Sequence, residues 1–348
     1  MGIGLGVISG STINAIAIQK DNGQLKLPNW LIFRGLSLSK NNTLKATNSG
    51  RKPNQILNRE VGLEEREITS LSKRWSEIAS KEKDLEASGF LLSIDNQEFA
   101  QLEASKRLPA ASAIKIPILL TVLSLIDSGE LNWDESLELT NDVVGGGAGW
   151  MAYQPTGKIF PVHEVATEMI RISDNTATNL LIKRIGGINI LNEHFKAFNL
   201  SSTEIKNLLP DLEGSNTTSA KDLALTIARI DSGELLSTRT RDLFREIMST
   251  SMTNRLLPGG FLKGLGVNKK EVDYNLLIKG YRIYNKTGDI GIAYADAGLI
   301  QMPDNTRAVA GFLVKGPFND PRSAELIRKM SAAMVPFLKS KRSSSSDD

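Results

Sequence analysis

The chain contains no cysteine, and its only two histidines are His163 and His194. Without cysteine there can be no disulfide, no thiol nucleophile and no thiolate-bound metal. Two histidines are too few for a multi-histidine metal site. We therefore expect neither a metal nor a cofactor. A Ser-His-Asp triad could still use either histidine, but neither lies in a recognisable nucleophile-elbow motif.

A strong charge imbalance is also lacking. The 348 residues include 42 Lys/Arg and 39 Asp/Glu, a formal net charge of +3. This small excess predicts no nucleic-acid partner. Hydrophobic residues make up 41% of the chain and charged residues 23%, values typical of soluble globular proteins. The length suits one large domain or two modest ones.

The N-terminal part gives two alternatives. Residues 2–18 carry no charge, but they are rich in glycine and serine and no basic residue precedes them. They could form a weak membrane anchor or signal core, or belong to a disordered leader. Residues 19–60 then carry eight Lys/Arg, a positive flank that argues against ordinary export of the downstream residues. We expect a leader and linker over residues 1–61 and a disordered tail over residues 339–348.

Between these ends the sequence predicts one domain over residues 62–338. An apolar stripe at helical spacing indicates a first helix, and its members are Ile68, Leu71, Trp75, Ile78 and Leu85. Strand patterns then follow at residues 89–94, 98–103, 282–286, 294–302 and 308–315. A last helix is expected from Pro321, with Asp320 as its N-cap.

These elements predict an α+β fold. Two strands come early, three come late, and a largely helical region lies between them, at about residues 112–256. Short hairpin links favour a five-stranded antiparallel sheet. The N- and C-terminal helices can cover one face of this sheet. The insert would form a separate all-helical lobe, and we expect the functional site in the groove between the lobe and the sheet.

Three short motifs carry the functional prediction. Ser-x-x-Lys occurs five times, but only Ser112-x-x-Lys115 opens an apolar run, IPILLTVLSLI. A lysine entering a buried helix is costly unless something pairs with it or uses it. The alternative is an N-cap serine beside a lysine that reaches the surface. Ser173-Asp174-Asn175 follows an apolar helical run, and Lys286-Thr287-Gly288 ends a predicted strand. Each of these two is also compatible with an ordinary cap or turn.

All three motifs, in this order, resemble the signature of class A β-lactamases and penicillin-binding proteins. RLPAASAIK, before the buried helix, is similar to the nucleophile region of class A β-lactamases. SDNTATNLL, which leads to Gly186-Gly187, is similar to their second motif and its helix. The order of strands and helices from about residue 62 to 338 also resembles that fold. The first sixty residues have no counterpart in it.

The resemblance implies a role for each motif residue. Ser112 would attack a lactam carbonyl and become acylated, and Lys115 would transfer protons. Ser173 would relay a proton to the departing nitrogen, assisted by Lys286. The substrate would be held by Asn175, by Lys286 and Thr287 at its carboxylate, and along the strand at Gly288. The backbone N–H groups of Ser112 and Asp289 would form the oxyanion hole.

One expected residue is missing. Class A β-lactamases use a glutamate, in a Glu-x-x-Leu-Asn loop, to activate the water that removes the acyl group. The corresponding interval here, LSSTEIKNLLPDLEGSNTTSAKDLA, has no such motif. Glu204 and Glu213 are the only glutamates in it and thus the candidate deacylation bases. Surface positions are the alternative for both.

We therefore expect a serine hydrolase acylated by β-lactams, with a class A-like β-lactamase as the first hypothesis. The alternatives are a D-Ala-D-Ala peptidase with slow deacylation and a non-hydrolysing domain that senses cell-wall peptides or β-lactams. The expected partner is a small β-lactam or cell-wall peptide, not a nucleic acid. Such substrates predict a periplasmic or other extracytoplasmic location, with membrane association possible through residues 2–18.

Overall fold

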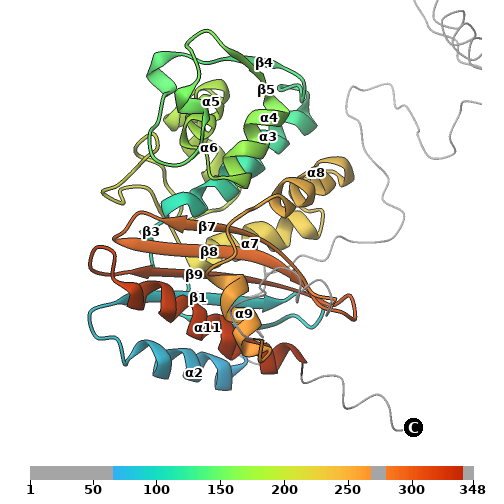
Figure 1. Cartoon of the computed structure of the whole chain (residues 1–348). Coiled ribbons are helices and arrows are strands. Elements are labelled where there is room, and N and C mark those ends of the chain that lie inside the picture. Colours follow the sequence, from blue (N-terminus) through green and yellow to red (C-terminus); the bar gives the residue numbers. More distant parts are fainter. Residues whose placement is uncertain (1–65, 268–279, 340–348) are drawn as a thin grey trace, which may run out of the picture. The chain divides into compact units, whose positions relative to one another are not determined.

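The computed structural model describes residues 66–267 and 280–339, so the predicted leader at residues 1–61 and residues 340–348 of the predicted tail lie outside these ranges. Over the described residues the protein has an α+β fold (Figure 1). Its helices are α2 (Thr69–Ala79), α3 (Lys115–Ser128), α4 (Val162–Arg171), α5 (Asn175–Ile185), α6 (Ile188–Ala197), α7 (Ala220–Asp231), α8 (Thr238–Ser249), α9 (Leu257–Gly264) and α11 (Pro321–Lys339). Three short 3₁₀ turns, η3 (Ala111–Ile114), η4 (Asn141–Val143) and η5 (Met151–Tyr153), lie in the same ranges.

The main sheet has five strands in the order β2-β1-β9-β8-β7, and every neighbouring pair is antiparallel. The strands are β1 (Glu86–Ser93), β2 (Glu98–Leu102), β7 (Arg282–Asp289), β8 (Ala293–Gln301) and β9 (Arg307–Lys315). This sheet confirms the predicted fold class. The β7 strand forms one edge and runs three residues beyond its predicted end, so Lys286-Thr287-Gly288 lies inside the strand rather than at its end. Pairing of Asp289 with Tyr294 on β8 extends the strand.

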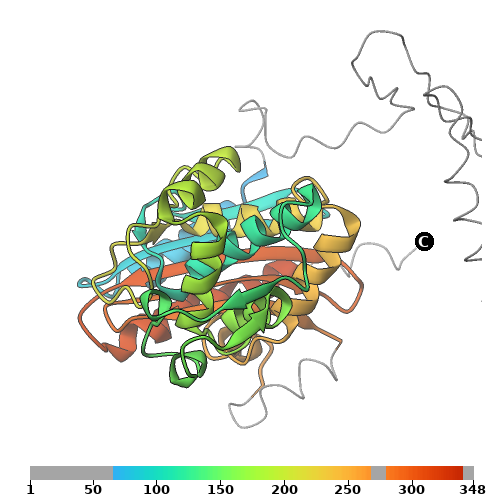
Figure 2. The same cartoon turned by 90° about the horizontal axis from the view of Figure 1, so that it is seen from above.

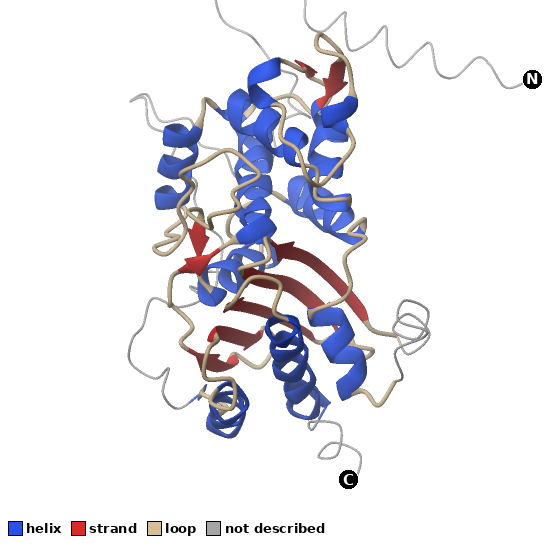
Figure 3. Cartoon of the chain, turned by 60° about the vertical axis from the view of Figure 1, so that its left-hand side comes forward, coloured by secondary structure: helices blue, strands red, loops and turns tan. Residues whose placement is uncertain are grey.

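Hydrophobic cores lie on both faces of the sheet, because successive side chains of a strand point to opposite faces. On β1, Phe90 and Leu92 belong to the core under the helical lobe, whereas Leu91 belongs to the core under α2, α9 and α11. Trp75 of α2 anchors the second core: its ring meets Phe312 edge-on at 5.4 Å and its Nε1 donates to the Met330 carbonyl. Figure 3 shows helices on both sides of the strands.

The inserted lobe is mostly, but not entirely, helical. Within it, β4 (Ser136–Glu138) pairs with β5 (Ile159–Pro161), and β6 (Thr217–Thr218) pairs with β3 (Leu108–Pro109), which lies just before the insert; both pairings are antiparallel. The α7 helix packs on β1, β8 and β9 as well as on α3. The prediction of an all-helical insert was therefore wrong for β4, β5 and β6. Figure 2 shows the lobe lying over the strands.

The α3 helix is the centre of the lobe. Of the described helices, only the segment Ala111–Ser128 is long and apolar enough to cross a membrane by length and composition, and 72% of it is buried inside the protein. Pro117 falls in its first turn, where backbone N–H groups have no partner within the helix and proline is tolerated. Gly129 ends the helix in a left-handed conformation, φ 78°.

Candidate active site

The predicted nucleophile lies just before the central helix rather than on it. Ser112 is in the 3₁₀ turn η3, and the α-helix begins at Lys115. The expectation that Ser112 opens or caps the helix is therefore wrong, and no side-chain capping bond is formed there. Ala111 has φ 45°, an unfavourable left-handed value that sets the direction of the turn. Ser112 remains partly exposed, whereas Lys115 is fully buried.

The Lys115 amine is the centre of a polar cluster. Its Nζ lies 3.3 Å from Ser112 Oγ, 3.0 Å from Ser173 Oγ and 2.9 Å from Asn175 Oδ1. It also donates to the Ser173 carbonyl at 2.6 Å. The structure thus brings together the first two motifs around one amine. A lysine buried among these groups has a partner for each of its N–H bonds, which explains how the apolar helix tolerates it.

Ser173-Asp174-Asn175 reaches the cluster because the chain turns sharply between α4 and α5. Ser173 has φ 64°, so its carbonyl and hydroxyl can both face Lys115. Asp174 is the N-cap of α5, and its Oδ1 accepts from the Ala177 N–H at 2.9 Å. Its Oδ2 accepts the backbone N–H groups of Trp150 and Met151. The middle residue of the motif therefore serves as a structural brace, fixed between the helix and the loop.

The glycine-rich segment at residues 145–149 forms a wall beside Asn175. Asn175 Nδ2 donates to the Gly146 carbonyl at 2.9 Å, and Gly145 N–H donates to Thr176 Oγ1 at 3.0 Å. Gly149 has φ 103°, and a Cβ there would lie 2.1 Å from Asp174 Oδ2. At position 149 the segment approaches the second motif so closely that only glycine fits.

The third motif is brought to Ser112 by the edge strand β7. A Cβ on Gly288 would lie 2.6 Å from the Ser112 backbone nitrogen, so strand and turn are in direct contact. Lys286 is fully buried, and its Nζ donates to the Thr287 carbonyl at 2.7 Å. Thr287 is half-buried and Asp289 exposed. All eight residues predicted for catalysis and substrate binding thus lie on η3, α3, the α4–α5 turn, the start of α5 and β7. Their roles stay predictions.

Burial lowers the pKa of both amines, and the charge of Lys286 adds to the shift of Lys115. Burial is the main reason why the pKa of Lys115 lies well below its ordinary value, and the positive charge of Lys286 lowers this pKa further. The negative charge of Asp174 acts in the opposite direction and raises it. Burial lowers the pKa of Lys286 to about 8, although Asp296 opposes this shift. A neutral Lys115 can accept the Ser112 proton, while a protonated Lys286 can hold an anion.

A buried carboxylate behind Thr287 was not predicted. Asp296 on β8 is fully buried and lies opposite Thr287 in the strand register. Its oxygens accept from Asn285 Nδ2, Thr287 Oγ1 and the Leu257 N–H at 2.9, 2.9 and 3.0 Å. Burial raises its pKa to about 6, against these hydrogen bonds and the charge of Lys286. A charged residue inside a strand as apolar as residues 293–302 was the available signal.

Neither candidate deacylation base joins the cluster. Glu204 pairs with Arg107 at 3.1 Å and Lys206 at 3.7 Å, and it lines a separate hollow of about 730 Å³ with Arg107, Asn192 and Lys196. Glu213 has an exposed side chain. The assignment of Glu204 is thus corrected, because its carboxylate neutralises two surface cations.

The loop that carries these glutamates approaches the cluster at a leucine instead. Leu209 is buried, and its backbone N–H and carbonyl are both bound by the Asn179 side chain, at 2.8 and 2.7 Å. Asn179 lies one turn after Asn175 on the same face of α5. The Leu209 carbonyl also lies against Gly145, 2.3 Å from where a Cβ would be.

Comparison with known proteins agrees with this geometry. The model of the Beta-lactamase enzyme family matches residues 70–338. The β-lactamase VEB-1 of Pseudomonas aeruginosa is 26% identical over 216 residues, which cover 56% of this chain and 66% of VEB-1. The extended-spectrum β-lactamase PER-1 of the same species is 24% identical over 249 residues, 67% of this chain and 76% of PER-1.

Solved structures extend the comparison. The structure of PBP-A is 38% identical, with a TM-score of 0.73, and the match covers 79% of this chain and 98% of PBP-A. A point variant of PBP-A, solved as an acyl-enzyme complex with penicillin G, matches equally well. An ancestral class A β-lactamase shares the fold at 20% identity, with a TM-score of 0.66 over 77% of this chain and 99% of that protein. This chain belongs to the β-lactamase enzyme family, within the superfamily of serine β-lactamases and penicillin-binding proteins.

Proposed function

We propose that the protein is a serine acyltransferase that β-lactams acylate at Ser112 and that releases the acyl group slowly. The observation that carries this proposal is the contact of one buried amine, Lys115, with the hydroxyls of both Ser112 and Ser173. Its lowered pKa leaves a neutral fraction that can take the Ser112 proton. The acyl-enzyme of the PBP-A variant with penicillin G supports a β-lactam as the acylating agent.

Slow release follows from the wall of the site. Hydrolysis of the ester needs a base that activates water, and a positioned base contributes about 10²–10⁴-fold to such a step. The loop in which that base was sought contacts α5 through the backbone of Leu209, which is bound by Asn179, and the Leu209 side chain is apolar and buried. Glu204 is bound to two surface cations. This arrangement favours a penicillin-binding activity on D-Ala-D-Ala-type cell-wall peptides, with β-lactams as inhibitors.

Efficient β-lactamase turnover is the second candidate. The chain beside Glu213 runs close to the segment that leads to Ser112. A Cβ on the next residue, Gly214, would lie 2.9 Å from Pro109, which is three residues before Ser112. An exposed carboxylate near that segment could act through a water. VEB-1 and PER-1, at 26% and 24% identity, are β-lactamases by name and support this candidate.

The deciding experiment follows the acyl-enzyme itself. The full chain is mixed with a chromogenic cephalosporin, and intact mass and colour are recorded together. We expect an adduct of one cephalosporin molecule per chain, and this adduct should be absent in Ser112→Ala. Its lifetime should be many times longer than one turnover of an efficient β-lactamase. Fast colour development without an adduct, reduced in Glu213→Gln, would establish the β-lactamase instead. A chain that shows neither adduct nor turnover would overturn both.

Location is part of the same proposal. Cell-wall peptides and β-lactams meet their targets outside the cytoplasmic membrane, so we place the catalytic domain in an extracytoplasmic compartment. Residues 2–18 supply the possible anchor, which fractionation of cells that express the full chain would test. The sensor alternative keeps the same location and differs only in an acyl-enzyme that is not turned over at all.

A further inference from the structure

The hydroxyl of Thr287 has more acceptors than it can serve. Its Oγ1 lies 2.9 Å from Asp296 Oδ2 and 3.2 Å from the Thr253 carbonyl. The carbonyl can only accept a hydrogen bond, and so can the carboxylate of an ionised Asp296. A hydroxyl has one proton to donate. A charged acceptor forms the stronger hydrogen bond, so the ionised Asp296 holds that proton. Asn285 Nδ2 donates to Thr287 Oγ1 at 3.3 Å, so the side of this oxygen that remains for a ligand carries a lone pair and no proton.

This matters because Thr287 is expected to bind an anion. The proposed substrates carry a carboxylate, which also only accepts hydrogen bonds. It can bind Thr287 only if the hydroxyl proton turns away from Asp296. The other partners of Asp296, Asn285 Nδ2 and the Leu257 N–H, stay in place. A protonated Asp296 would remove the conflict, because it can donate to Thr287 Oγ1 and leave the threonine proton free.

We propose that Asp296 is a positioning residue that competes with the substrate's carboxylate for the Thr287 proton, so that anion recognition at this edge of the sheet is coupled to protonation of Asp296. The inference rests on the proposed function, since it needs a carboxylate-bearing substrate. It assigns a role to a residue outside the three motifs. The residue acts through Thr287 and does not touch the substrate itself.

The electrostatic surroundings are compatible with this coupling. Burial already favours the neutral acid, with a pKa of about 6 for Asp296 before any ligand binds. Lys286 on β7 is the charged group that acts on Asp296, and it favours the ionised form. On other elements packed against β8, several charged groups are paired: Lys263 and Arg328 with Glu325, Arg307 with Asp95 and Asp231, and Lys315 with Glu86. Lys221 and Asp222 of α7 and Arg282 of β7 are further charged groups on elements that pack against β8.

The sign of the pH dependence follows. Below the pKa of Asp296 the Thr287 proton is free and the anion binds well, whereas above it the carboxylate competes and binding weakens. Lys286 adds a second loss near pH 8, where it loses its own charge. The two losses are separable, because only the first one needs the Thr287 hydroxyl.

The test compares a cephalosporin with its methyl ester, which lacks the anion. Second-order acylation rates of the full chain are measured for both by intact mass between about pH 5 and about pH 9, and their ratio cancels the shared chemistry at Ser112 and Lys115. We expect the acid-to-ester ratio to fall about tenfold through the range around pH 6, as one contested hydrogen bond to a charged group is lost. In Thr287→Val, which keeps every charge, this step should disappear while the fall near pH 8 remains. In Asp296→Asn the step should also disappear, and the alkaline fall should move to lower pH, because Asp296 no longer supports the charge of Lys286.

Asp222→Asn is the matched control. Asp222 is also buried and accepts from a threonine hydroxyl, Thr203, and from a backbone N–H, that of Ser202, both at 2.8 Å, but it lies on α7. The acid-to-ester ratio of Asp222→Asn should change with pH as that of the wild type does. A wild-type ratio that is flat around pH 6, or a step that persists in Thr287→Val, would overturn the inference while leaving the acylation of Ser112 intact. Failure of both compounds to form an adduct would overturn the proposed function and this inference together.

Discussion

At the scale of single residues, the two buried amines of Lys115 and Lys286 need opposite charge states. In the proposed function, Lys115 must be neutral to accept the Ser112 proton, and Lys286 must be charged to hold an anion. The second condition supports the first, because the charge on Lys286 lowers the pKa of Lys115. Burial alone would push both amines toward the neutral form, and Asp296 counters this for Lys286.

The first prediction is a bell-shaped pH dependence of acylation. On the acid side the rate falls because Lys115 gains a proton, and on the alkaline side it falls near pH 8 because Lys286 loses one. In Lys286→Arg the guanidinium stays charged across this range, so the alkaline fall should move up by more than one pH unit. The measurement is the acylation rate by intact mass. If the alkaline fall in rate does not move in Lys286→Arg, a group other than Lys286 causes it.

Sequence reasoning was strongest at this scale, where a motif fixes the kind of residue and its spacing. Ser112 and Lys115 are three residues apart, and a helical turn brings such residues together whatever the rest of the fold. Asp296 and Leu209 could not be found in this way. Their neighbours, Thr287 and Asn179, are 9 and 30 residues away along the chain, and only tertiary packing brings them together.

Gly288 gives a second prediction, because the space between this residue of β7 and the η3 turn that carries Ser112 is too small for a methyl group. A Cβ there would lie 2.6 Å from Ser112 N, so Gly288→Ala must push the turn away. We expect a loss of stability of about 1–3 kcal/mol and at least about a tenfold slower acylation. Gly146→Ala is the control, since a Cβ at 146 meets nothing within 4 Å. Equal rates in the two variants, from folded protein, would contradict the role of this contact.

At the scale of elements, the proposed function makes the loop between α6 and β6 responsible for the lifetime of the acyl group. Asn216, at the end of this loop, accepts the N–H groups of Lys206 and Asn207 near its middle, and Asn179 binds the backbone of Leu209. Such a loop cannot bring Glu204 to Ser112 without breaking these bonds. The sequence showed that the glutamate motif was absent but not which residue occupied the wall.

Leu209→Glu tests this account of the loop. In the proposed function, a carboxylate at 209 places a base on the loop segment that Asn179 holds against α5, so the acyl-enzyme should decay at least about tenfold faster. Burying a carboxylate without a partner should also cost stability, more than about 3 kcal/mol. Leu208→Glu is the matched control, because the neighbouring leucine is 37% exposed. An acyl-enzyme of unchanged lifetime in folded Leu209→Glu would mean that the wall does not limit release.

The boundaries of elements were the least predictable feature at this scale. The β7 strand continues through the third motif because Asp289 still pairs with Tyr294, a contact that no local pattern indicates. The predicted helix at Ser112 starts instead with a 3₁₀ turn, because Ala111 adopts φ 45°. Periodicity located the strands and helices, but the long-range pairing set where they end.

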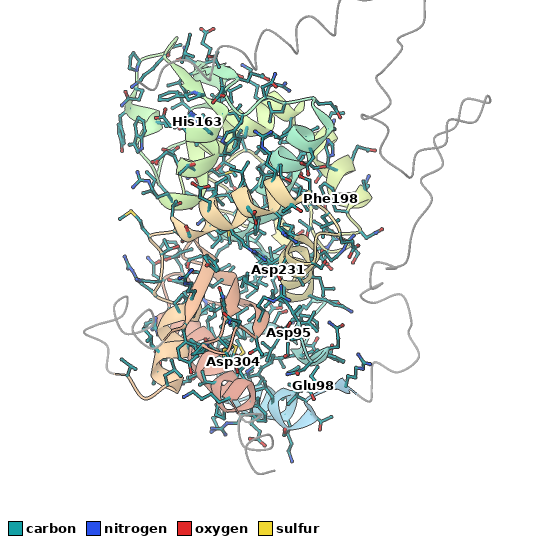
Figure 4. All side chains as sticks on the ribbon, turned by 90° about the vertical axis from the view of Figure 1, so that its right-hand side faces the viewer. Asp95, Glu98, His163, Phe198, Asp231 and Asp304 are labelled. Atoms are coloured by element: carbon teal, nitrogen blue, oxygen red, sulfur yellow. The ribbon has the colours of Figure 1, made fainter. Side chains whose placement is uncertain are left out.

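For the whole molecule, the lobe must be held in register with the sheet, since the site takes Ser173 and Asn175 from one and Lys286 from the other. An ion-pair network spans this junction. Asp231, at the end of α7, has a side chain only 2% exposed and is paired with Arg245 of α8 and, at 2.6 Å, with Arg307 of β9. Arg307 also contacts Asp95 in the β1–β2 turn at 3.1 Å. In Figure 4, Asp231 lies between the lobe, labelled at His163, and the lower part, labelled at Asp95.

Asp231→Asn should therefore destabilise the fold far more than an ordinary surface change. It leaves two arginines facing a neutral amide at a buried position, and breaking a buried ion pair in this way costs about 3 kcal/mol. Asp242→Asn removes another carboxylate near Arg245, 3.9 Å away, but that side chain is 63% exposed and the loss should stay below about 0.5 kcal/mol. Urea unfolding measures both, and the midpoint should shift while the slope stays constant, because both variants unfold the same surface. Equal midpoints for the two variants would mean that packing of α7 on the sheet, rather than these charges, holds the lobe in place.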